Sequence, residues 1–337
     1  MKVLNEFVHL RFKGVTTSPW SIGRRSHSDV IYCQNYLWGR AVRGPVLNYL
    51  LKVFCPNLPT KKLPCDRCSL SKECPFYNLY GADKEGSYKD TPKLIVTSLT
   101  FKDANSIFQR IPLISRSVLS NSVALGPVFI EFIPPGVEFE FEVIFTGEAT
   151  RFVEQFKEGV RATLALTGWG GQCSRGYGRG KILGVEERDF EDWVSDFIDS
   201  PTEHLIGSRE VELSIHPIMI LLKDNGEPYT SILEDDFRRK LRNSMQERYW
   251  QFFKENYHMK SIKTISGPCY FTKVRVWSRK ESKELTFGGL AGEMKIEFRE
   301  PLNQKDARVI GVCRYGVGRY KNQGFGSLRL KMEGETM

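Results

Sequence analysis

The sequence has no apolar run long enough to span a membrane. IMILL at 218–222 is among its longest apolar stretches, far short of the roughly 20 residues that a spanning helix needs. The first fourteen residues, MKVLNEFVHLRFKG, carry charges throughout and lack the apolar segment of a signal peptide. We therefore expect a cytosolic protein that does not associate with a membrane. In that compartment its eight cysteines are expected to be free thiols or metal ligands rather than disulfides.

Acidic residues are almost absent from three parts of the chain. Residues 7–65 contain a single acid, Asp29, and residues 159–185 and 307–332 contain none. These parts carry net charges of +8, +4 and +6, while the whole chain of 337 residues carries +9, so the remainder is acidic. Positive charge segregated in this way is typical of a protein that binds a polyanion. The alternative is a solvated basic face without a ligand.

Two of the basic parts contain the same glycine pattern. GWGGQCSRGYG at 168–178 and GVGRYKNQGFG at 316–326 both fit Gly-x-Gly-x5-Gly-aromatic-Gly, at a constant offset of 148 residues. The coincidence predicts an internal duplication. Each half has a pattern of strand, helix, two strands, helix, glycine loop and strand, which is typical of a ferredoxin-like arrangement with helices on one face of an antiparallel sheet.

The predicted fold class is therefore α+β, with tandem ferredoxin-like (RRM-like) domains. The first domain is expected at 1–190, with a cysteine-rich insertion at 55–80 and a glycine loop at 168–180. The second is expected at 205–337, with a glycine loop at 314–326. The acidic segment 187–208 between them is either a linker or a small helix. Strands are expected near 3–13, 93–99, 127–146, 181–185, 209–222, 269–277, 293–299 and 327–332, and helices near 33–53, 149–166, 231–254 and 303–313. Residue types alternate in the strand at 3–13 and in FEFEVIF within 127–146, and the helix at 231–254 has apolar residues spaced by four: Leu233, Phe237, Leu241, Met245 and Tyr249.

The glycine stretches do not fit the known nucleotide-binding loops. A phosphate-binding loop follows a strand and opens a helix, whereas here a helix comes first and a strand follows. Gly180-Lys181 is followed by Ile182 rather than by a hydroxyl residue. The remaining use is close approach of the backbone to a phosphodiester chain, whose phosphates arginine and lysine would neutralise. The alternative is tight packing of the loop against its sheet, and the two are compatible.

The C-terminal motifs resemble a known family. GGLAGEMKIEF at 288–298, a predicted helix and then GVGRYKNQGFGSL at 316–328 resemble the C-terminal region of CRISPR repeat-cleaving endoribonucleases of the RAMP superfamily. The first half is similar through RAVRGPVLNYL, the cysteine cluster ending in CPFYNLYG, and the first loop. The resemblance implies metal-independent cleavage of CRISPR precursor RNA, in which a 2′-hydroxyl attacks the adjacent phosphate and leaves a cyclic phosphate and a 5′-hydroxyl.

Non-cleaving RAMP subunits that hold guide RNA in effector complexes share this fold, so RNA binding without cleavage is the alternative function. A general single-stranded RNA binder is a third possibility.

This resemblance makes the basic and glycine residues of the loops, with two arginines of the first predicted helix, candidates for RNA contacts. The predicted partners are CRISPR repeat or precursor RNA and, under the alternative, other subunits of an effector complex. The predicted RNA-binding residues are Arg40, Arg43, Arg175, Gly176, Gly178, Arg179, Lys181, Arg314, Gly316, Gly318, Arg319, Tyr320, Lys321, Gly324 and Gly326.

Cleavage needs an acid and a base, and histidine suits both roles near neutral pH. Of the five histidines, His9 and His216 lie in apolar predicted strands, His204 follows an acidic segment and His258 ends a helix. His27 lies in the basic region from which the family's catalytic histidine, where there is one, often comes, so we predict it as the general acid–base. An ordinary polar loop residue is the alternative. Arg24 or Arg25 is predicted to contact the phosphate, and Tyr32 or Tyr36 to assist.

Four cysteines have the spacing of a metal site. Cys55, Cys65, Cys68 and Cys74 follow C-x9-C-x2-C-x5-C-P within a proline-rich segment. Four thiolates at this spacing predict a closed, structural Zn²⁺ site without an open position for catalysis. Four reduced thiols are the alternative. The remaining cysteines are expected to be buried thiols: Cys33, Cys173, Cys269 and Cys313.

Overall fold

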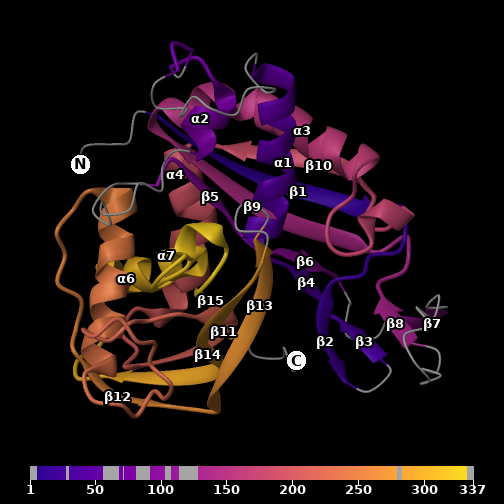
Figure 1. Ribbon diagram of the computed structural model, residues 1–337. Helices are drawn as coiled ribbons and strands as arrows, with labels where there is room; N and C mark the ends of the chain where they lie inside the picture. The colour runs from indigo at the N-terminus through magenta and orange to yellow at the C-terminus, as the bar shows by residue number, and fades with distance from the viewer. Residues whose placement is uncertain are drawn as a thin grey trace.

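The structure is a computed structural model that describes residues 6–27, 30–55, 68–70, 72–80, 92–102, 108–113, 128–278 and 283–331. For residues 24–27 and 30–32 it describes the path of the strand and not the side chains. Two antiparallel sheets with helices against them form the body of the molecule (Figure 1). We call the residues up to Arg188 the first half and the residues from Glu210 the second half. In the described residues no helix is both long and apolar enough to cross a membrane.

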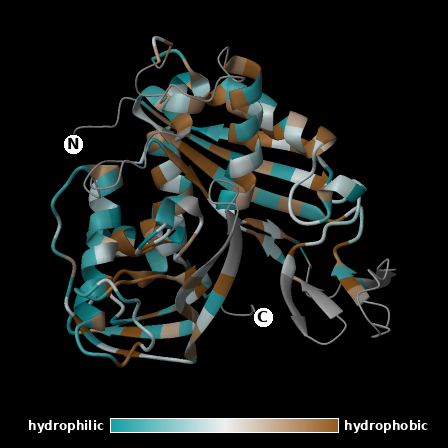
Figure 2. Cartoon of the chain, in the orientation of Figure 1, coloured by the Kyte–Doolittle hydropathy of each residue, from teal (hydrophilic) through white to brown (hydrophobic). Residues whose placement is uncertain are grey.

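The sheet of the first half has the strand order β10–β1–β9–β6–β4, with β5 also paired to β9. Helices α1 (Gly39–Phe54) and α3 (Val153–Leu166) pack together on one of its faces (Figure 1). Figure 2 shows apolar residues along the strands beside these helices. The strands are β1 (Phe7–Thr16), β4 (Tyr36–Leu37), β5 (Leu94–Val96), β6 (Leu99–Phe101), β9 (Glu138–Thr146) and β10 (Gly180–Arg188).

Alternation of residue types explains which face of this sheet α1 and α3 cover. Leu10 and Phe12 of β1 and Phe141 of β9 are fully or almost fully buried under the helices. Arg11 and Lys13, which alternate with them, point to the face opposite α1 and α3, because successive side chains of a strand point to opposite sides. The sequence pattern therefore determines which face of the sheet receives α1 and α3.

The sheet of the second half has the order β12–β14–β11–β15, with β13 also paired to β14. Strands that pair with the same neighbour are counted here as one: β5 and β6 form the second strand of the first half, and β12 and β13 that of the second half. In both sheets the last strand then lies beside the first, the first beside the third and the third beside the second. Helices α6 (Phe237–Phe253) and α7 (Gln304–Val312) pack against each other on this half. The strands are β11 (Glu210–Met219), β12 (Ile262–Ser266), β13 (Cys269–Ser278), β14 (Lys283–Phe298) and β15 (Ser327–Leu330).

The four-residue spacing predicted for the long helix of the second half is correct over most of its length. Phe237, Leu241, Met245 and Tyr249 are all buried on α6. Leu233 is different: it precedes the helix and is 81% exposed. The helix begins only after Asp236, whose backbone is left-handed, so Leu233 lies in the preceding turns and not on the buried face.

A third, four-stranded sheet was not predicted. It has the order β2–β3–β8–β7, with β3 and β8 parallel, and projects beside the first half (Figure 1). Its strands are β2 (Gly23–His27), β3 (Val30–Cys33), β7 (Gln109–Leu113) and β8 (Val128–Phe132).

The segment 187–208, left open between linker and helix, forms short helical turns. They are α4 (Phe190–Trp193), η5 (Val194–Asp199), α5 (Ser200–Thr202) and η6 (Glu203–Leu205). Trp193 is fully buried and packs on Phe7 of β1, with ring centroids 4.9 Å apart. Phe7, Ile95 and Ile144 of the first half belong to the same apolar core as the second half. The two halves therefore meet through packed apolar side chains as well as through the chain connection.

Candidate nucleic-acid interface

The two glycine loops have the same backbone conformation. The first loop (168–178) joins α3 to β10 and the second (316–326) joins α7 to β15, as the duplication predicts. A short 3-10 turn occurs at the same place in each, η4 (Cys173–Arg175) and η8 (Lys321–Gln323). Gln172 and Tyr320, which are equivalent, have φ values of 58° and 60°. Positive φ values occur at all four glycines of each loop: Gly168, Gly170, Gly176 and Gly178, and Gly316, Gly318, Gly324 and Gly326.

The last glycine of each loop is required by a close approach of the chain to itself. A Cβ atom on Gly178 would lie 2.0 Å from the Trp169 carbonyl oxygen, and one on Gly326 would lie 2.1 Å from that of Val317. In both loops that same pair of residues is joined by a backbone hydrogen bond of 2.9 Å. Tight packing, the alternative considered from the sequence, therefore accounts for these glycines.

The glycines predicted to contact RNA donate their N–H groups to hydrogen bonds within the protein. Those of Gly178 and Gly326 donate to the carbonyls of Pro19 and Ile218, each at 2.8 Å, and that of Gly318 donates to Ser244 Oγ at 2.8 Å. Gly176, Gly316 and Gly324 donate to carbonyl oxygens within their own loops or the turn before. In this structure the glycines shape the loops and do not present donors to a phosphate. Phosphate contacts here would come from side chains.

The first loop and the residues that follow it into β10 turn their cations outward. Arg175, Arg179 and Lys181 are exposed, and among the described residues none of them forms an ion pair. A Cβ atom on Gly176 would meet nothing within 4 Å, so the tip of this loop is open. The carbonyl of Arg179 accepts a 2.7 Å hydrogen bond from Trp20 Nε1, which anchors the backbone while its side chain stays exposed. This surface can attract a polyanion without first breaking internal ion pairs.

The second loop presents fewer cations than the sequence suggested. Lys321 is only 5% exposed, and its Nζ lies 2.8 Å from Glu247 Oε1 on α6. Burial, with a contribution from Arg248, lowers the pKa of Lys321. Arg314 forms an ion pair with Glu142, and Arg43 is buried with its guanidinium donating to the Leu79 carbonyl at 2.8 Å. These three predicted RNA contacts serve packing in this structure. Arg319 is exposed and Tyr320 and Arg40 are partly exposed.

The tip of the second loop is docked on the first half. Ser98 Oγ donates to the Gly324 carbonyl at 3.1 Å, and the rings of Phe325 and Trp38 lie 4.7 Å apart. A Cβ atom on Gly324 would lie 2.8 Å from the Gly39 nitrogen, whereas the equivalent Gly176 has open space. The duplicated loops therefore differ in environment: the first is open and the second forms part of the joint between the halves.

This difference predicts unequal effects of one substitution at equivalent positions. Gly176→Ala and Gly324→Ala introduce the same left-handed strain, because both glycines have φ near +85°. Only Gly324→Ala places the methyl group against the backbone of the first half, so it should cost about 1–3 kcal/mol more in free energy of unfolding. Urea denaturation of the two variants measures the difference. Equal losses would contradict the docked second loop.

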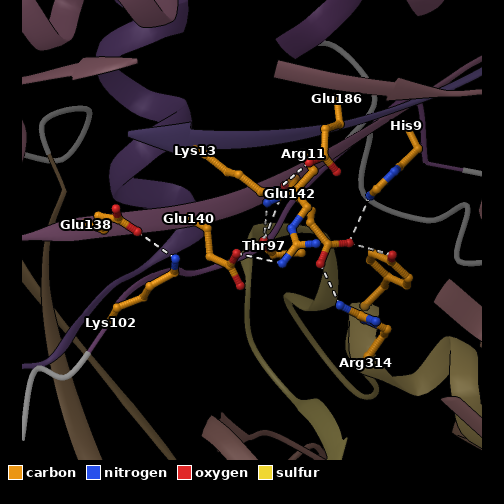
Figure 3. A network of polar contacts seen from close by, with 11 residues as sticks. His9, Arg11, Lys13, Thr97, Lys102, Glu138, Glu140, Glu142, Glu186 and Arg314 are labelled. Carbon is orange, nitrogen blue, oxygen red and sulfur yellow. Dashed lines mark hydrogen bonds and ion pairs between the residues drawn. The ribbon is translucent and has the colours of Figure 1, made fainter. Parts of the chain in front are cut away.

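Ion pairs between neighbouring strands neutralise the face of the first sheet opposite α1 and α3 and the face of the second sheet opposite α6 and α7. In the first half Arg11 lies 2.7 Å from Glu140 and Lys102 lies 2.6 Å from Glu138, and Lys13 pairs with Glu186 (Figure 3). In the second half the pairs are Lys295–Glu210 at 2.6 Å, Lys263–Glu297 at 2.6 Å and Lys331–Glu293 at 2.9 Å. Because each cation has a carboxylate beside it, neither face concentrates positive charge in the way the first glycine loop does.

One carboxylate on the first sheet holds the two halves together. Glu142 of β9 accepts hydrogen bonds from Arg314 at 2.6 Å and from the Tyr315 hydroxyl at 2.6 Å, and lies 2.9 Å from His9 Nε2 (Figure 3). Burial raises the pKa of Glu142, but the charge of Arg314 and the hydrogen bond from His9 outweigh it and hold the pKa well below its usual range. The carboxylate is therefore ionised, and it is a structural anion at the joint.

The predicted catalytic residues lie on the third sheet and on β4. His27 ends β2 and is in register with Val30, Arg24 and Arg25 belong to the same strand, and Tyr32 lies on β3. The side chains of these four are outside what the structure describes, so their roles stay predictions. Tyr36 is described: its ring lies 4.6 Å from that of His216 and 5.4 Å from that of Trp38, at the joint.

His9 and His216 lie in strands, as expected, whereas His258, expected at the end of a helix, lies in the irregular segment that follows α6. His9 is fully buried, and burial followed by the charge of Arg329 lowers the pKa of His216 well below its usual value. His204 and His258 are exposed. Among the described histidines, two are therefore packed into the structure and two face solvent.

The cysteine prediction falls partly outside the described residues. Cys55, Cys68 and Cys74 are half-buried free thiols, and Cys65 is not described. Within the described part of the chain no three His, Cys, Asp or Glu side chains are grouped to hold a metal. The four-thiolate zinc site stays a prediction. Of the other cysteines, Cys33 and Cys313 are buried as expected, whereas Cys173 and Cys269 are only partly buried.

Comparisons with known proteins return CRISPR-associated structures. No family model matches the chain, and no curated protein matches it. It is similar to a Cas6 product complex, with 11% identity and a TM-score of 0.46 over 97% of this chain and 99% of that chain. A Thermus thermophilus Cas6 gives 9% identity and a TM-score of 0.43 over 97% and 98%. A chain of a type III-B Cmr-β complex bound to cognate target RNA gives 14% identity and a TM-score of 0.39. That match covers 55% of this chain and 61% of the other.

Proposed function

We propose that this chain binds RNA and cleaves CRISPR repeat RNA, as a metal-independent endoribonuclease made of two tandem ferredoxin-like domains. The observation that carries the proposal is the repeated glycine loop. Its backbone conformation recurs in both halves, and its first copy turns Arg175, Arg179 and Lys181 to the surface. A basic loop whose cations form no ion pair with the described residues suits a ligand with closely spaced phosphates.

The tandem arrangement is supported by the strand order of the two large sheets. In each, the fourth strand of the repeat pairs with the first, the first with the third and the third with the second. That order, with both helices on one face, is the ferredoxin-like topology. The domains proposed are 1–190 and 205–337, and the turns between β10 and β11 would connect them.

The proposed path for the RNA backbone follows the first glycine loop. The sheet faces opposite these helix pairs are less suitable, because the lysines and arginines named on them already pair with glutamates. Breaking such a pair to bind a phosphate exchanges one ionic contact for another and gains little. The cations of the first loop have no such competition from the described residues, so they dominate the electrostatic contribution to binding.

Arg175→Ala is expected to weaken binding of every RNA sequence to a similar extent. Loss of one phosphate contact should reduce the slope of log K against log salt concentration by about 0.7–0.9. Lys102→Ala is the matched control, because Lys102 is also an exposed cation but pairs with Glu138 at 2.6 Å; its slope should equal that of the wild type. The measurement is fluorescence anisotropy with labelled RNA between about 50 and 200 mM salt. Identical slopes for the two variants would exclude the first loop from the interface.

The proposed chemistry is transfer of the phosphoryl group to the neighbouring 2′-hydroxyl. A base takes the 2′-hydroxyl proton, the oxygen attacks phosphorus, and the bond to the 5′-oxygen breaks as an acid gives that oxygen a proton. His27 is proposed as the acid–base, with Arg24 or Arg25 neutralising the phosphate and Tyr32 or Tyr36 assisting. The products are a 2′,3′-cyclic phosphate and a 5′-hydroxyl. No metal takes part in this scheme, and a structural Zn²⁺ at Cys55, Cys65, Cys68 and Cys74 is proposed separately.

Incubation with CRISPR repeat RNA tests this function. The expected result is a shorter RNA that ends in a cyclic phosphate, formed in the presence of a chelator. The second candidate is a non-catalytic subunit that holds guide RNA within an effector complex. It is favoured by the first loop itself, whose exposed cations account for binding without any acid or base. Tight binding of repeat RNA that never yields product would decide for this candidate.

A further inference from the structure

Aromatic side chains from both halves form a continuous strip at the joint. We define the joint aromatic strip as Tyr36, Trp38, Phe287, Tyr320 and Phe325. Neighbouring ring centroids are 5.4 Å apart for Tyr36 and Trp38, 4.7 Å for Trp38 and Phe325, and 5.0 Å for Phe287 and Tyr320. Trp38 and Phe325 are buried, whereas the other three members are partly exposed. The strip therefore has a fixed base with aromatic surface open to solvent at both ends.

Tyr320 is the member whose conformation calls for an explanation. Its φ of +60° is uncommon for a bulky residue, which loses about 1–2 kcal/mol in the left-handed region. Gln172 has the same conformation at the equivalent position of the first loop, so the loop itself does not need an aromatic residue there. Residues held in strained conformations are concentrated where a ligand is bound. The ring of Tyr320 is also positioned by Phe287 and Phe325, at centroid distances of 5.0 and 6.1 Å.

The charge around the strip is positive. The exposed guanidinium of Arg319 lies over the Tyr320 ring, 5.1 Å from its centroid. Among the described residues Arg319 forms no ion pair. Arg329 of β15 lies near His216, which itself contacts Tyr36. Arg40 follows Gly39, the residue against which the second loop docks. An anionic ligand with flat apolar groups matches this combination, because it supplies a counter-charge to the exposed Arg319, which a purely apolar partner does not.

We propose that the joint aromatic strip is a stacking site for an unpaired nucleobase of single-stranded RNA, with the base on Tyr320 and the adjacent phosphate on Arg319. The inference rests on the proposed RNA binding and adds a second contact region, distant in sequence from the first glycine loop. Stacking on an aromatic ring is available to every base and contributes about 1–3 kcal/mol per base. The strip is therefore expected to favour single-stranded over duplex RNA without reading sequence.

The test compares Tyr320→Gln with Tyr320→Phe. Glutamine is the residue that the equivalent position of the first loop carries in the same backbone conformation, so Tyr320→Gln removes the ring and keeps the loop. It is expected to weaken binding of a single-stranded RNA by about 5–150-fold, with a small change in the salt slope. Tyr320→Phe keeps the ring and should bind within about twofold of the wild type, since the stacking contribution is retained. Binding of a blunt RNA duplex should not change in either variant.

An independent measurement leaves the protein intact. Abasic residues introduced one at a time into the single-stranded RNA should weaken wild-type binding at one position, and that position should be insensitive in Tyr320→Gln. If Tyr320→Gln does not fold, abasic substitution of the RNA with the wild-type protein still tests the stacking site. Unchanged affinity of Tyr320→Gln, or no sensitive abasic position, overturns the stacking site. If the Arg175→Ala salt effect is nevertheless present, RNA binding stands without the strip. If the wild type binds no RNA, the proposed function itself falls.

Discussion

Glu142→Gln is expected to lower the free energy of unfolding by about 2–4 kcal/mol at pH 7. The substitution keeps the size of the side chain and removes the charge that Arg314 and His9 surround. Breaking one partner of a buried ion pair leaves the other desolvated, which typically costs about 3–5 kcal/mol. We expect a smaller loss because the Arg314 side chain is still 33% exposed and can recover water. Urea denaturation followed by circular dichroism measures the change.

Glu140→Gln is the matched control. Glu140 lies two residues away on the same strand and face, and its ion pair with Arg11 is 2.7 Å long (Figure 3). Both side chains of that pair are about one-third exposed, so the pair should contribute less than about 1 kcal/mol. If both variants lose the same stability, Glu142 is an ordinary surface carboxylate and the joint does not depend on it.

The pH dependence follows from the direction of the Glu142 pKa. The folded protein lowers that pKa, so the ionised carboxylate stabilises the fold fully above the unfolded value of about 4.3. This stabilisation is lost as the pH falls below that value towards the folded pKa. The difference in stability between wild type and Glu142→Gln should therefore be constant near neutral pH and shrink below about pH 4. A difference that grows in acid would contradict the assigned sign.

His27→Ala is expected to slow cleavage of repeat RNA about a hundredfold or more, while the dissociation constant for RNA stays nearly unchanged. Loss of a positioned acid or base typically costs about 10²–10⁴-fold in rate. Binding should persist, because the exposed cations of the first glycine loop, such as Arg175, are intact. Single-turnover cleavage with saturating protein separates the two quantities, since it measures the chemical step alone.

His204→Ala is the control for this variant, because His204 is exposed on the turns between the halves and has no proposed role. RNA with a 2′-deoxy residue at the cut position should not be cleaved by any form of the protein, since the attacking oxygen is missing. Cleavage by His27→Ala at the wild-type rate would leave RNA binding in place and move the acid–base role elsewhere. The tyrosines and lysines of the basic N-terminal region would then be tested next.

The sequence alone predicted the features that depend on local patterns. The repeated glycine motif predicted two loops of equal conformation, and each of the repeated glycines has a positive φ. Four-residue spacing predicted the buried face of α6, and alternation predicted β1 and β9. These predictions hold because backbone conformation in a helix, a strand or a glycine turn is set largely by residues close in sequence. The third sheet had no such signal, since its β3–β8 pairing joins residues about a hundred positions apart.

Tertiary structure alone decided which cations of the two loops face solvent. Arg175 of the first loop is exposed, whereas Lys321, two residues earlier in the equivalent turn of the second, is buried against Glu247, 74 residues away. Arg314 finds its carboxylate partner in Glu142, 172 residues away. A basic residue is available to a ligand only if the fold brings no acid to it. For Arg314 that depends on how the second half docks on the first, and for Lys321 on how α6 packs against the loop within the second half; no local pattern in the sequence specifies either.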